Sequence, residues 1–313
     1  MKALEYDGYG GIERLELRDA PEPAVARGGV RVRVACAALN PKDAVVRRGK
    51  FRIVTGRRFP KRCGVDFAGQ VVASDDPAFR PGDRVFGALH ELTYARGTLA
   101  EEVAVRGFEI AALPARVRQE DAAALALVGL TSLQALRDVA RLRPGGRVLI
   151  HGASGGVGTA AIQVARLLGG RVTTRSSAAS RELCLSLGAE TALDREGEAI
   201  AADGGFDAVF DVFGDFSFER ARALLAPGGT FVSTVPSPRR VAMNLWSRVS
   251  ARGERLIIVR PSRGDLDRLA AWMADGSLRA VVDSHFGLAE FAAAFRRLES
   301  KRARGKIVVA VGG

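Results

Sequence analysis

Residues 147–158 read RVLIHGASGGVG, and this stretch predicts a nucleotide-binding turn. Arg147–His151 has the composition of a buried strand, and glycines fill most of Gly152–Gly158. Apolar residues then recur at spacings of three and four as far as Leu168, which is typical of a helix. In such a strand–turn–helix the missing Cβ atoms let the backbone approach a pyrophosphate, and the helix N-terminus attracts its charge. We therefore predict that a dinucleotide contacts Ser154, Gly155, Gly156, Val157 and Gly158.

The strand that follows indicates which dinucleotide is bound. NAD sites usually carry an acid about 20 residues after the first glycine, to hold the ribose 2′-hydroxyl. Here Gly170–Thr174 is followed by Arg175, and no acid occurs before Glu182. A carboxylate would repel a 2′-phosphate, whereas Arg and Ser side chains bind one. We expect NADPH, with Arg175, Ser176, Ser177 and Arg181 as its ligands; the alternative is that both arginines are solvated surface residues.

Strand and helix patterns divide the chain into an N-terminal β-rich part and an α/β part. The predicted strands of the first part are Val30–Ala35, Asp66–Ala73, Asp83–Phe86 and Ala100–Val105. Helices at Asp121–Leu127 and Ser132–Ala140 then precede strands that alternate with helices, at Arg147–His151, Arg171–Thr174, Phe206–Val212, Gly229–Val235 and Arg255–Val259. This alternation predicts a parallel sheet with right-handed crossovers.

The tail and one long loop complete this pattern. The tail is predicted to hold a helix Leu266–Asp275, a strand Ala280–Asp283, a helix Leu288–Ser300 and a strand Lys306–Val311. The irregular stretch Pro236–Arg252 follows a sheet strand. Loops in that position lie at the carboxyl edge of the sheet, where ligands bind.

Composition narrows the class of protein. The 313 residues suffice for two domains, and 47 Lys and Arg against 35 Asp and Glu give a net charge of +12. Basic and aromatic residues do not alternate as in nucleic-acid-binding modules, so we expect no nucleic-acid partner. We see neither a signal peptide nor an apolar run near the ~18 residues of a membrane span, and Cys36, Cys63 and Cys184 suggest no disulfide framework. We expect a cytoplasmic protein with no membrane partner.

Several motifs together resemble the zinc-independent medium-chain dehydrogenase/reductases of the quinone oxidoreductase and enoyl-thioester reductase type. Besides the glycine turn, they are ALNPKD (38–43), GVDFAG (64–69), PGDRVFG (81–87), GTLAE (97–101), GLT (129–131), LGAE (187–190) and GKIV (305–308). Their order and spacing match the family over nearly the whole chain. The resemblance implies an α/β protein with a GroES-like β domain, residues 1–117 and 264–313, and a Rossmann doubly wound parallel-sheet domain, residues 118–263. It also implies a homodimer, by analogy only.

The resemblance speaks against a metal. In zinc-dependent relatives the positions of Asn40, Val65 and Val128 hold Cys, His and Cys, and valine cannot bind a metal. His90, His151 and His285 are too far apart in sequence to suggest a metal site. Without a Lewis acid, reduction of a polarised C=C bond is more accessible than alcohol oxidation, because hydrogen-bond donors can stabilise the enolate.

The resemblance also implies roles for single residues. Asn40 and Thr131 match family positions beside the nicotinamide, and Asp211 and Lys306 match positions near the cofactor. Arg195 stands where the family often has a tyrosine on the adenine, and arginine can stack on a base or pair with the 2′-phosphate. The alternatives are an N-cap amide at Asn40, a hydroxyl bonded to its own helix at Thr131 and a strand-end turn at Asp211.

The proton donor is not evident from the sequence. Many enoyl-thioester reductases have a tyrosine at the position of Phe51, which here carries no hydroxyl. Tyr94, His90 and Lys42 are weak substitutes, each expected rather at the surface.

A basic segment follows the NPKD motif. Between Arg47 and Arg62 there are eight basic residues and no acid. With Phe51, we place Arg57, Arg58 and Arg62 at the substrate mouth, where cations would attract the phosphates of a CoA ester. The alternative is a solvated basic loop.

These observations predict an NADPH-dependent reductase of activated C=C bonds, acting on a short or branched 2-enoyl-CoA. A quinone or small-enone oxidoreductase is the second hypothesis. A weakly catalytic or non-catalytic NADPH-binding protein is the third.

Overall fold

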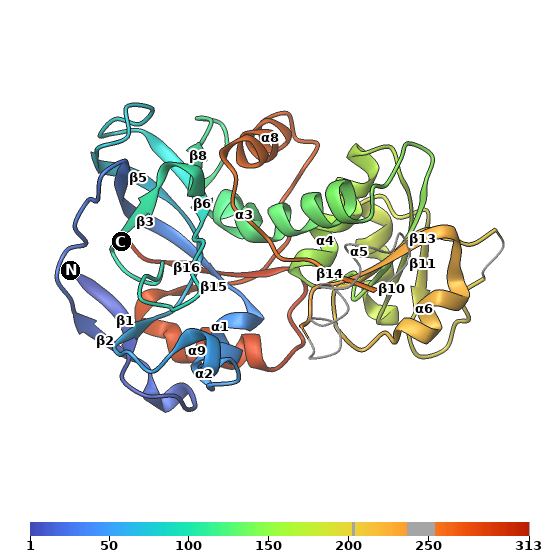
Figure 1. Cartoon of the computed structure of the whole chain (residues 1–313), viewed down its shortest axis with the longest axis horizontal. Coiled ribbons are helices and arrows are strands. Elements are labelled where there is room, and N and C mark those ends of the chain that lie inside the picture. The colour runs from blue at the N-terminus through green and yellow to red at the C-terminus, as the bar shows by residue number, and fades with distance from the viewer. Residues whose placement is uncertain (202–203, 237–253, 313) are drawn as a thin grey trace. The chain divides into compact units, whose positions relative to one another are not determined.

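A computed structural model describes residues 1–201, 204–236 and 254–312. The chain forms two compact units (Figure 1). Unit 1 consists of Met1–Leu127 and Arg260–Gly313, and unit 2 of Val128–Val259. The division lies at 127/128 and 259/260, whereas the sequence placed it at 117/118 and 263/264. The helix that begins at Gln119 starts in unit 1, where the N–H of Leu127 donates to Asp66 Oδ1 at 2.8 Å.

Unit 2 is built on a six-stranded parallel sheet. Its spatial order is β11-β10-β9-β12-β13-β14. β9, the first of these strands in sequence, lies inside the sheet; β10 and β11 follow on one side of it, and β12, β13 and β14 on the other. The strands are β9 (Arg147–His151), β10 (Arg171–Ser176), β11 (Thr191–Asp194), β12 (Phe206–Asp211), β13 (Leu225–Ser233) and β14 (Glu254–Leu256). All five pairings are parallel, which confirms the predicted doubly wound sheet.

Helices cover this sheet because their apolar faces need burial. They are α4 (Gly156–Leu167), α5 (Arg181–Ser186), α6 (Phe218–Leu224) and the short η4 (Ala178–Ser180). α4 packs on β9 and β10, and α6 on β12 and β13. The core includes Leu149, Val209 and Phe231, all fully buried.

Unit 1 holds two antiparallel-rich sheets. Three strands pair in the order β2-β1-β4, namely β2 (Glu16–Asp19), β1 (Lys2–Tyr6) and β4 (Lys61–Arg62). The larger sheet follows the order β15-β16-β3-β5-β6-β8, with β7 also paired to β3. Its strands are β15 (Val282–Gly287), β16 (Lys306–Ala310), β3 (Gly29–Leu39), β5 (Asp66–Ser74), β6 (Arg84–Ala88), β7 (Glu102–Arg106) and β8 (Ile110–Ala112).

The helices of unit 1 come from both ends of the chain. They are α1 (Pro41–Arg47), α2 (Arg52–Thr55), α8 (Arg263–Ala274), α9 (Phe291–Glu299), and the 3-10 turns η1 (Ile12–Arg14), η2 (Gly107–Glu109) and η5 (Leu288–Glu290). α1 lies beside α9, as Figure 1 shows. The fully buried Val34, Phe67 and Phe295 belong to one continuous core.

The helix after residue 118 differs from the prediction. α3 (Gln119–Leu133) runs without a break into the π-helix η3 (Gln134–Val139), where two helices were expected. Gly129 does not end it, because an isolated glycine costs a helix only ~1 kcal/mol. Within the described residues, Gln119–Val139 is the one segment with the length and composition of a membrane span, which the sequence reading missed. Its most apolar window is 78% buried, as in a core helix.

Three other outcomes concern the strands and one predicted loop. β1, β2, β4, β8 and β11 were not predicted, and β15 lies further along the chain than Ala280–Asp283. These strands are short or carry charged residues, so their alternation is weak. The predicted loop Pro236–Arg252 lies outside the described residues except at Pro236.

Candidate functional site

The glycine turn of unit 2 connects β9 to α4, and different physical constraints apply to its glycines. Gly152 has a φ of +81°, which favours glycine. A Cβ on Gly158 would lie 2.5 Å from Ala153 Cα, so the helix can pack this closely on the turn only with glycine there. A Cβ on Gly155, the N-cap of α4, would meet only Gly152 O at 3.7 Å. The fold therefore does not require glycine at 155, whereas a phosphate approaching the helix N-terminus would.

His151 lies in a polar cluster at the carboxyl ends of three strands. It pairs in register with Arg175 of β10 and with Asp211 of β12. His151 Nε2 lies 2.5 Å from Asp215 Oδ1, and Arg175 Nη1 lies 3.4 Å from His151 Nδ1. Because a guanidinium can only donate, Nδ1 must accept and the proton sits on Nε2. Burial lowers the pKa of His151, against the opposing influence of Asp215.

Arg175 is turned into unit 2. It is 8% exposed, so it is not a solvated surface residue. Its Nη2 donates to the carbonyl of Arg195, and its buried Nε has no partner among the described residues. Arg175 is therefore committed to internal contacts.

The other predicted phosphate ligands lie around the end of β10. Ser176 is buried, with Oγ 3.7 Å from Cys184 Sγ, and Ser177 is exposed. Arg181 Nη2 pairs with Glu198 Oε1 at 2.6 Å. The side chain of Arg195 is 41% exposed and lies over the ring of Phe213, 5.6 Å from its centroid. Arg195 is thus the most available guanidinium of this group.

The carboxylate of Asp211 accepts hydrogen bonds from other groups of unit 2. Its Oδ1 accepts the Gly214 N–H at 2.7 Å, and its Oδ2 accepts the Ser233 hydroxyl at 3.4 Å. With His151 and Asp215 it forms a group whose ligand atoms lie within 4.8 Å of one another, as at a metal site. Sequence reasoning missed this group because it considered only the spacing of the histidines. The bonds above satisfy its members, and the nearby Arg175 disfavours a cation, so we assign no metal to it.

Thr131 lies in the unit 2 part of α3 and is 6% exposed. Its predicted role beside the nicotinamide stays a prediction.

In unit 1, Asn40, Asp66 and Lys306 form a buried network. Lys306 Nζ donates to Leu39 O at 2.9 Å, to Asn40 Oδ1 at 2.8 Å and to Asp66 Oδ2 at 2.8 Å. Asn40 Nδ2 donates to Asp66 Oδ2 at 2.9 Å. The three N–H groups of Lys306 are thereby used, so the structure does not support the predicted contact of Lys306 with the cofactor.

The network also changes the interpretation of Asn40. Both ends of its amide are engaged, so it is held by the protein rather than free to reach a substrate. The amide makes no N-cap bond either; the Asp43 carboxylate instead accepts the Asn40 N–H at 2.8 Å. Asp66, which sequence reasoning missed, is recognisable as an acid that begins an otherwise apolar strand.

The first turn of α1 carries two groups with shifted pKa values. Burial raises the pKa of Asp43 to about 6, and its Oδ1 has no partner among the described residues. Burial lowers the pKa of the neighbouring Lys42, although the Asp43 and Asp66 carboxylates act in the opposite direction. The residue remains partly exposed, and no hydrogen bond or ion pair of its ammonium is found within the described ranges.

The other two proton-donor candidates differ in burial. His90 is exposed, as expected. Tyr94 is only 2% exposed and its hydroxyl has no partner in the described part of the chain, so the expectation of a surface tyrosine was wrong.

The basic segment is partly neutralised by acids that lie far away in sequence. Arg47 is fully buried and pairs with Glu299 at 2.5 Å, and Lys61 Nζ donates to Thr55 O and Thr93 O. Arg62 pairs with Glu5 at 2.8 Å and is largely covered, so little of its charge is available to a ligand; its place at the substrate mouth stays a prediction. Phe51 is partly exposed, just before α2.

Four cations of the segment are exposed and form no ion pair within the described residues. They are Lys50, Arg52, Arg57 and Arg58. On the same segment Ile53 is 96% exposed and Val54 63% exposed. Charge available to an anionic ligand is therefore confined to residues 50–58.

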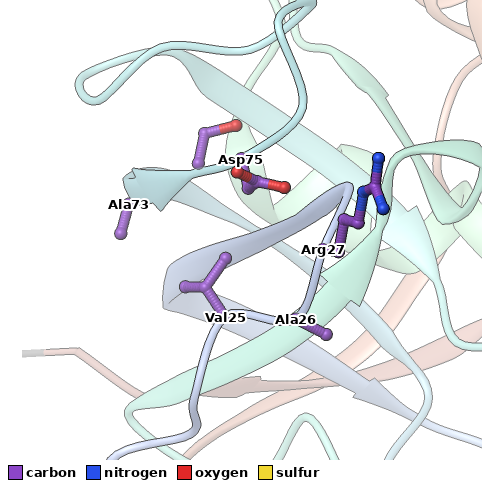
Figure 2. Close-up of a pocket in the computed structure, with 6 residues that line it drawn as sticks. Val25, Ala26, Arg27, Ala73 and Asp75 are labelled. Carbon is purple, nitrogen blue, oxygen red and sulfur yellow. The ribbon is translucent and has the colours of Figure 1, made fainter.

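A hollow of about 610 Å³ lies on unit 1, and Figure 2 shows the side chains that line it. Val25, Ala26 and Arg27 line one side, and Ala73, Ser74 and Asp75 the other. Asp75 accepts the Gly28 N–H at 2.6 Å, and Ser74 Oγ donates to Asp76 O at 2.8 Å. These polar groups close a loop onto β5, and none belongs to the candidate site.

Comparison with known proteins gives consistent matches. A zinc-binding dehydrogenase model matches residues 187–309, and an alcohol dehydrogenase GroES-like domain model matches residues 26–115. A chloroplast envelope quinone oxidoreductase homolog from Arabidopsis thaliana is 31% identical over 99% of this chain and 98% of its own. A trans-enoyl reductase from Aspergillus terreus is 33% identical over 99% of this chain and 96% of its own. A mycobacterial protein solved in complex with NADPH superposes with a TM-score of 0.80 at 27% identity, covering 99% of both chains.

The residues at the positions discussed above do not fit the zinc implied by one model's description. Val65 is fully buried and Val128 is 2% exposed, and neither side chain has a ligand atom. Asn40 is the only polar member of the three, and its amide is held by Lys306 and Asp66.

Proposed function

Because the chain belongs to the medium-chain dehydrogenase/reductases of the quinone oxidoreductase type, a nicotinamide-dependent family of oxidoreductases, we propose that it is an NADPH-dependent reductase of activated C=C bonds that works without zinc. The proposed substrate is a short or branched 2-enoyl-CoA. The observation that carries this proposal is the glycine turn at α4 combined with a strand β10 that ends in Arg and Ser rather than in an acid. The NADPH-bound relative supports the choice of cofactor.

The residues divide the work as follows. The first turn of α4 binds the pyrophosphate, and the exposed Ser177 after β10 and Arg195 after β11 bind the 2′-phosphate. When bound, NADPH supplies the hydride for the β-carbon of the substrate. The electron pair of the C=C bond then moves to the thioester oxygen as an enolate, which needs a proton at the α-carbon.

We propose Lys42 as the group that returns this proton. The residue is partly exposed, its ammonium is not paired among the described residues, and burial lowers its pKa. An acid with a pKa nearer neutrality transfers its proton more readily. The carboxylates of Asp43 and Asp66 favour the charged form, which allows the lysine to be reprotonated from water.

The exposed cations between Lys50 and Arg58 support a CoA ester as substrate. A CoA moiety carries several phosphate charges, and a cluster of unpaired cations raises its rate of encounter. A quinone or small enone lacks these charges and would gain nothing from the cluster.

The deciding experiment follows NADPH oxidation by absorbance. Crotonyl-CoA, 3-methylcrotonyl-CoA, a naphthoquinone and a simple enone are supplied in parallel to the purified protein. Faster oxidation with the CoA esters is the expected result. Oxidation with only the quinone or the enone would favour a quinone oxidoreductase, the function named for the Arabidopsis relative. NADPH binding without turnover would instead indicate a non-catalytic binding protein.

A further inference from the structure

Arg195 presents an exposed guanidinium at the carboxyl edge of the unit 2 sheet. Its only carboxylate neighbour within 4 Å among the described residues is Glu196, at 3.7 Å, which is itself 79% exposed. The ring of Phe213 lies beneath the guanidinium and limits its orientation. By contrast, Arg181 already has a close carboxylate partner in Glu198. Of these arginines, Arg195 is therefore the one best able to bind a phosphate.

Arg175 anchors the segment that carries Arg195. The Arg195 N–H donates to Ser176 O at 2.8 Å, and the Arg195 carbonyl accepts a hydrogen bond from Arg175 Nη2. The first of these bonds fixes the backbone on one side of Arg195, and the second ties it to a buried side chain. The position of Arg195 thus depends on where the Arg175 guanidinium points.

The inward position of Arg175 depends in turn on His151. Burial works against a charged Arg175, and the guanidinium groups of Arg220 and Arg195 repel it, whereas the carboxylates of Asp215 and Asp194 attract it. The lone pair of His151 Nδ1, 3.4 Å from Arg175 Nη1, is an acceptor that favours the inward position. This lone pair exists only while the imidazole is neutral.

We propose that His151 is a positioning residue that acts through Arg175 on Arg195, so that protonation of His151 weakens the discrimination of NADPH from NADH. The proposal rests on the proposed function for its cofactor. It adds a mechanism by which pH changes binding of the 2′-phosphate. A protonated imidazole presents N–H groups on both sides, so Nδ1 and Nη1 become two facing donors with like charge. Arg175 then leaves Nδ1, and the Arg195 carbonyl loses its side-chain anchor.

The charged groups around His151 set the pH at which this happens. Asp215, at 2.5 Å, and Asp211 favour the protonated imidazole, whereas Arg175 and burial oppose it. Burial has the larger effect and lowers the pKa of His151. The change is therefore expected on the acid side of the ordinary histidine value of about 6.5.

The test measures the dissociation constants of NADP⁺ and NAD⁺ by calorimetry between pH 5 and 8, on the full chain. NADP⁺ carries the same 2′-phosphate as NADPH, NAD⁺ lacks it as NADH does, and both oxidised nucleotides survive acid. That phosphate itself titrates near pH 6, by analogy with other phosphomonoesters, so the comparison between variants is the readout. In the wild type the preference for NADP⁺, measured as the dissociation constant of NAD⁺ divided by that of NADP⁺, should fall at low pH. This fall should be severalfold larger than in His151→Gln. The glutamine amide can both donate to Asp215 and accept from Arg175, and cannot be protonated.

Three variants complete the design. Asp215→Asn should move the acid transition of the wild type to lower pH, because the imidazolium loses its counter-charge. Arg195→Gln should weaken NADP⁺ binding about tenfold or more, as for the loss of one charge-assisted bond, and leave NAD⁺ binding unchanged. Arg171→Gln is the matched control: Arg171 is exposed and pairs with Glu190 at the opposite end of β10, so this variant should keep the NADP⁺ preference and the pH dependence of the wild type.

Two results overturn the inference while leaving the proposed function intact. One is an identical pH dependence in the wild type and His151→Gln, and the other is undiminished NADP⁺ preference in Arg195→Gln. If the wild type binds neither nucleotide at any pH, the proposed function fails and the inference fails with it.

Discussion

The ammonium of Lys306 and the carboxylate of Asp66 are 2.8 Å apart in the interior of unit 1, although 240 residues separate them in sequence. The side chain of Lys306 is 6% exposed and that of Asp66 is fully buried. The pair orients the Asn40 amide between them and joins β16 to the start of β5.

Removing the cation of this pair should destabilise unit 1. We expect Lys306→Met to lower the free energy of unfolding by about 3–5 kcal/mol, because it leaves a buried carboxylate without its counter-charge. Urea denaturation measures the change. In the control, Lys2→Met, the pair with Asp19 is exposed and its loss should cost at most about 1 kcal/mol. Equal effects of the two substitutions would show that the buried pair contributes no more than a surface one.

Substitutions at two glycines of the turn should distinguish an effect on folding from an effect on cofactor binding. Gly158→Ala should destabilise unit 2, since the new Cβ would lie 2.5 Å from Ala153 Cα. Gly155→Ala should leave the melting temperature nearly unchanged, because its Cβ meets only Gly152 O at 3.7 Å, but should weaken NADPH binding at least about tenfold by blocking the pyrophosphate. Thermal melts and calorimetry test the pair. Wild-type NADPH affinity in Gly155→Ala would exclude the turn as the phosphate site.

Asp43 should make stability depend on pH. Burial raises its pKa from 3.8 to about 6, so the folded state favours the protonated acid. Its favourable contribution is present below pH 4 and is lost as the pH rises through 6, a difference of about 3 kcal/mol for two pKa units. Asp43→Asn stays neutral, so its stability relative to the wild type should increase by that amount between pH 4 and 7. Denaturation at both pH values measures it, and a constant difference would contradict the raised pKa.

The exposed cations after α1 should affect CoA esters alone. We expect the double variant Arg57→Ala, Arg58→Ala to raise the KM for crotonyl-CoA severalfold without changing the KM for a small enone. The control is Arg268→Ala with Arg296→Ala, which removes the same charge from exposed positions of α8 and α9. Steady-state kinetics at low salt provides the comparison. Equal changes for both substrates would rule out a role in binding CoA.

Lys42 should matter for carbon protonation and not for hydride transfer. Lys42→Met should lower kcat for an enone or enoyl-CoA about 100-fold, the usual contribution of a general acid, and should spare reduction of a quinone, whose oxygens take protons from water. Lys2→Met serves as the control lysine. Should Lys42→Met reduce both substrates at wild-type rates, another group or water donates the proton.

The sequence predicted unit 2 better than unit 1 because the signals differ in range. In unit 2 the strand Arg147–His151, the glycine turn and α4 are adjacent in the chain, so their pattern is local. β1 and β4 carry charged residues and pair across more than fifty positions, and no local pattern marks such pairing.

The same distinction holds for side chains. Arg57 and Arg58 are exposed as predicted, whereas Arg62 is neutralised by Glu5 and Arg47 by Glu299, acids that no local window includes. Likewise, Asn40 is a site residue by motif, but its engagement by Lys306 follows only from β16 pairing with β3. Charge density along a sequence therefore overestimated the charge available to a ligand.

The pairing of β16 with β3 also sets an order of events during synthesis. Residues 307–310 pair with Cys36–Leu39, so that part of β3 lacks this neighbour until the residues that follow unit 2 have left the ribosome. Unit 2 is contiguous, and all its strands are synthesised while unit 1 is still incomplete. Domains fold as units in the order in which they are completed. Unit 2, the proposed cofactor-binding unit, therefore folds first. Until β16 is synthesised, the unpaired edge of β3 in unit 1 is the surface that chaperones would have to protect.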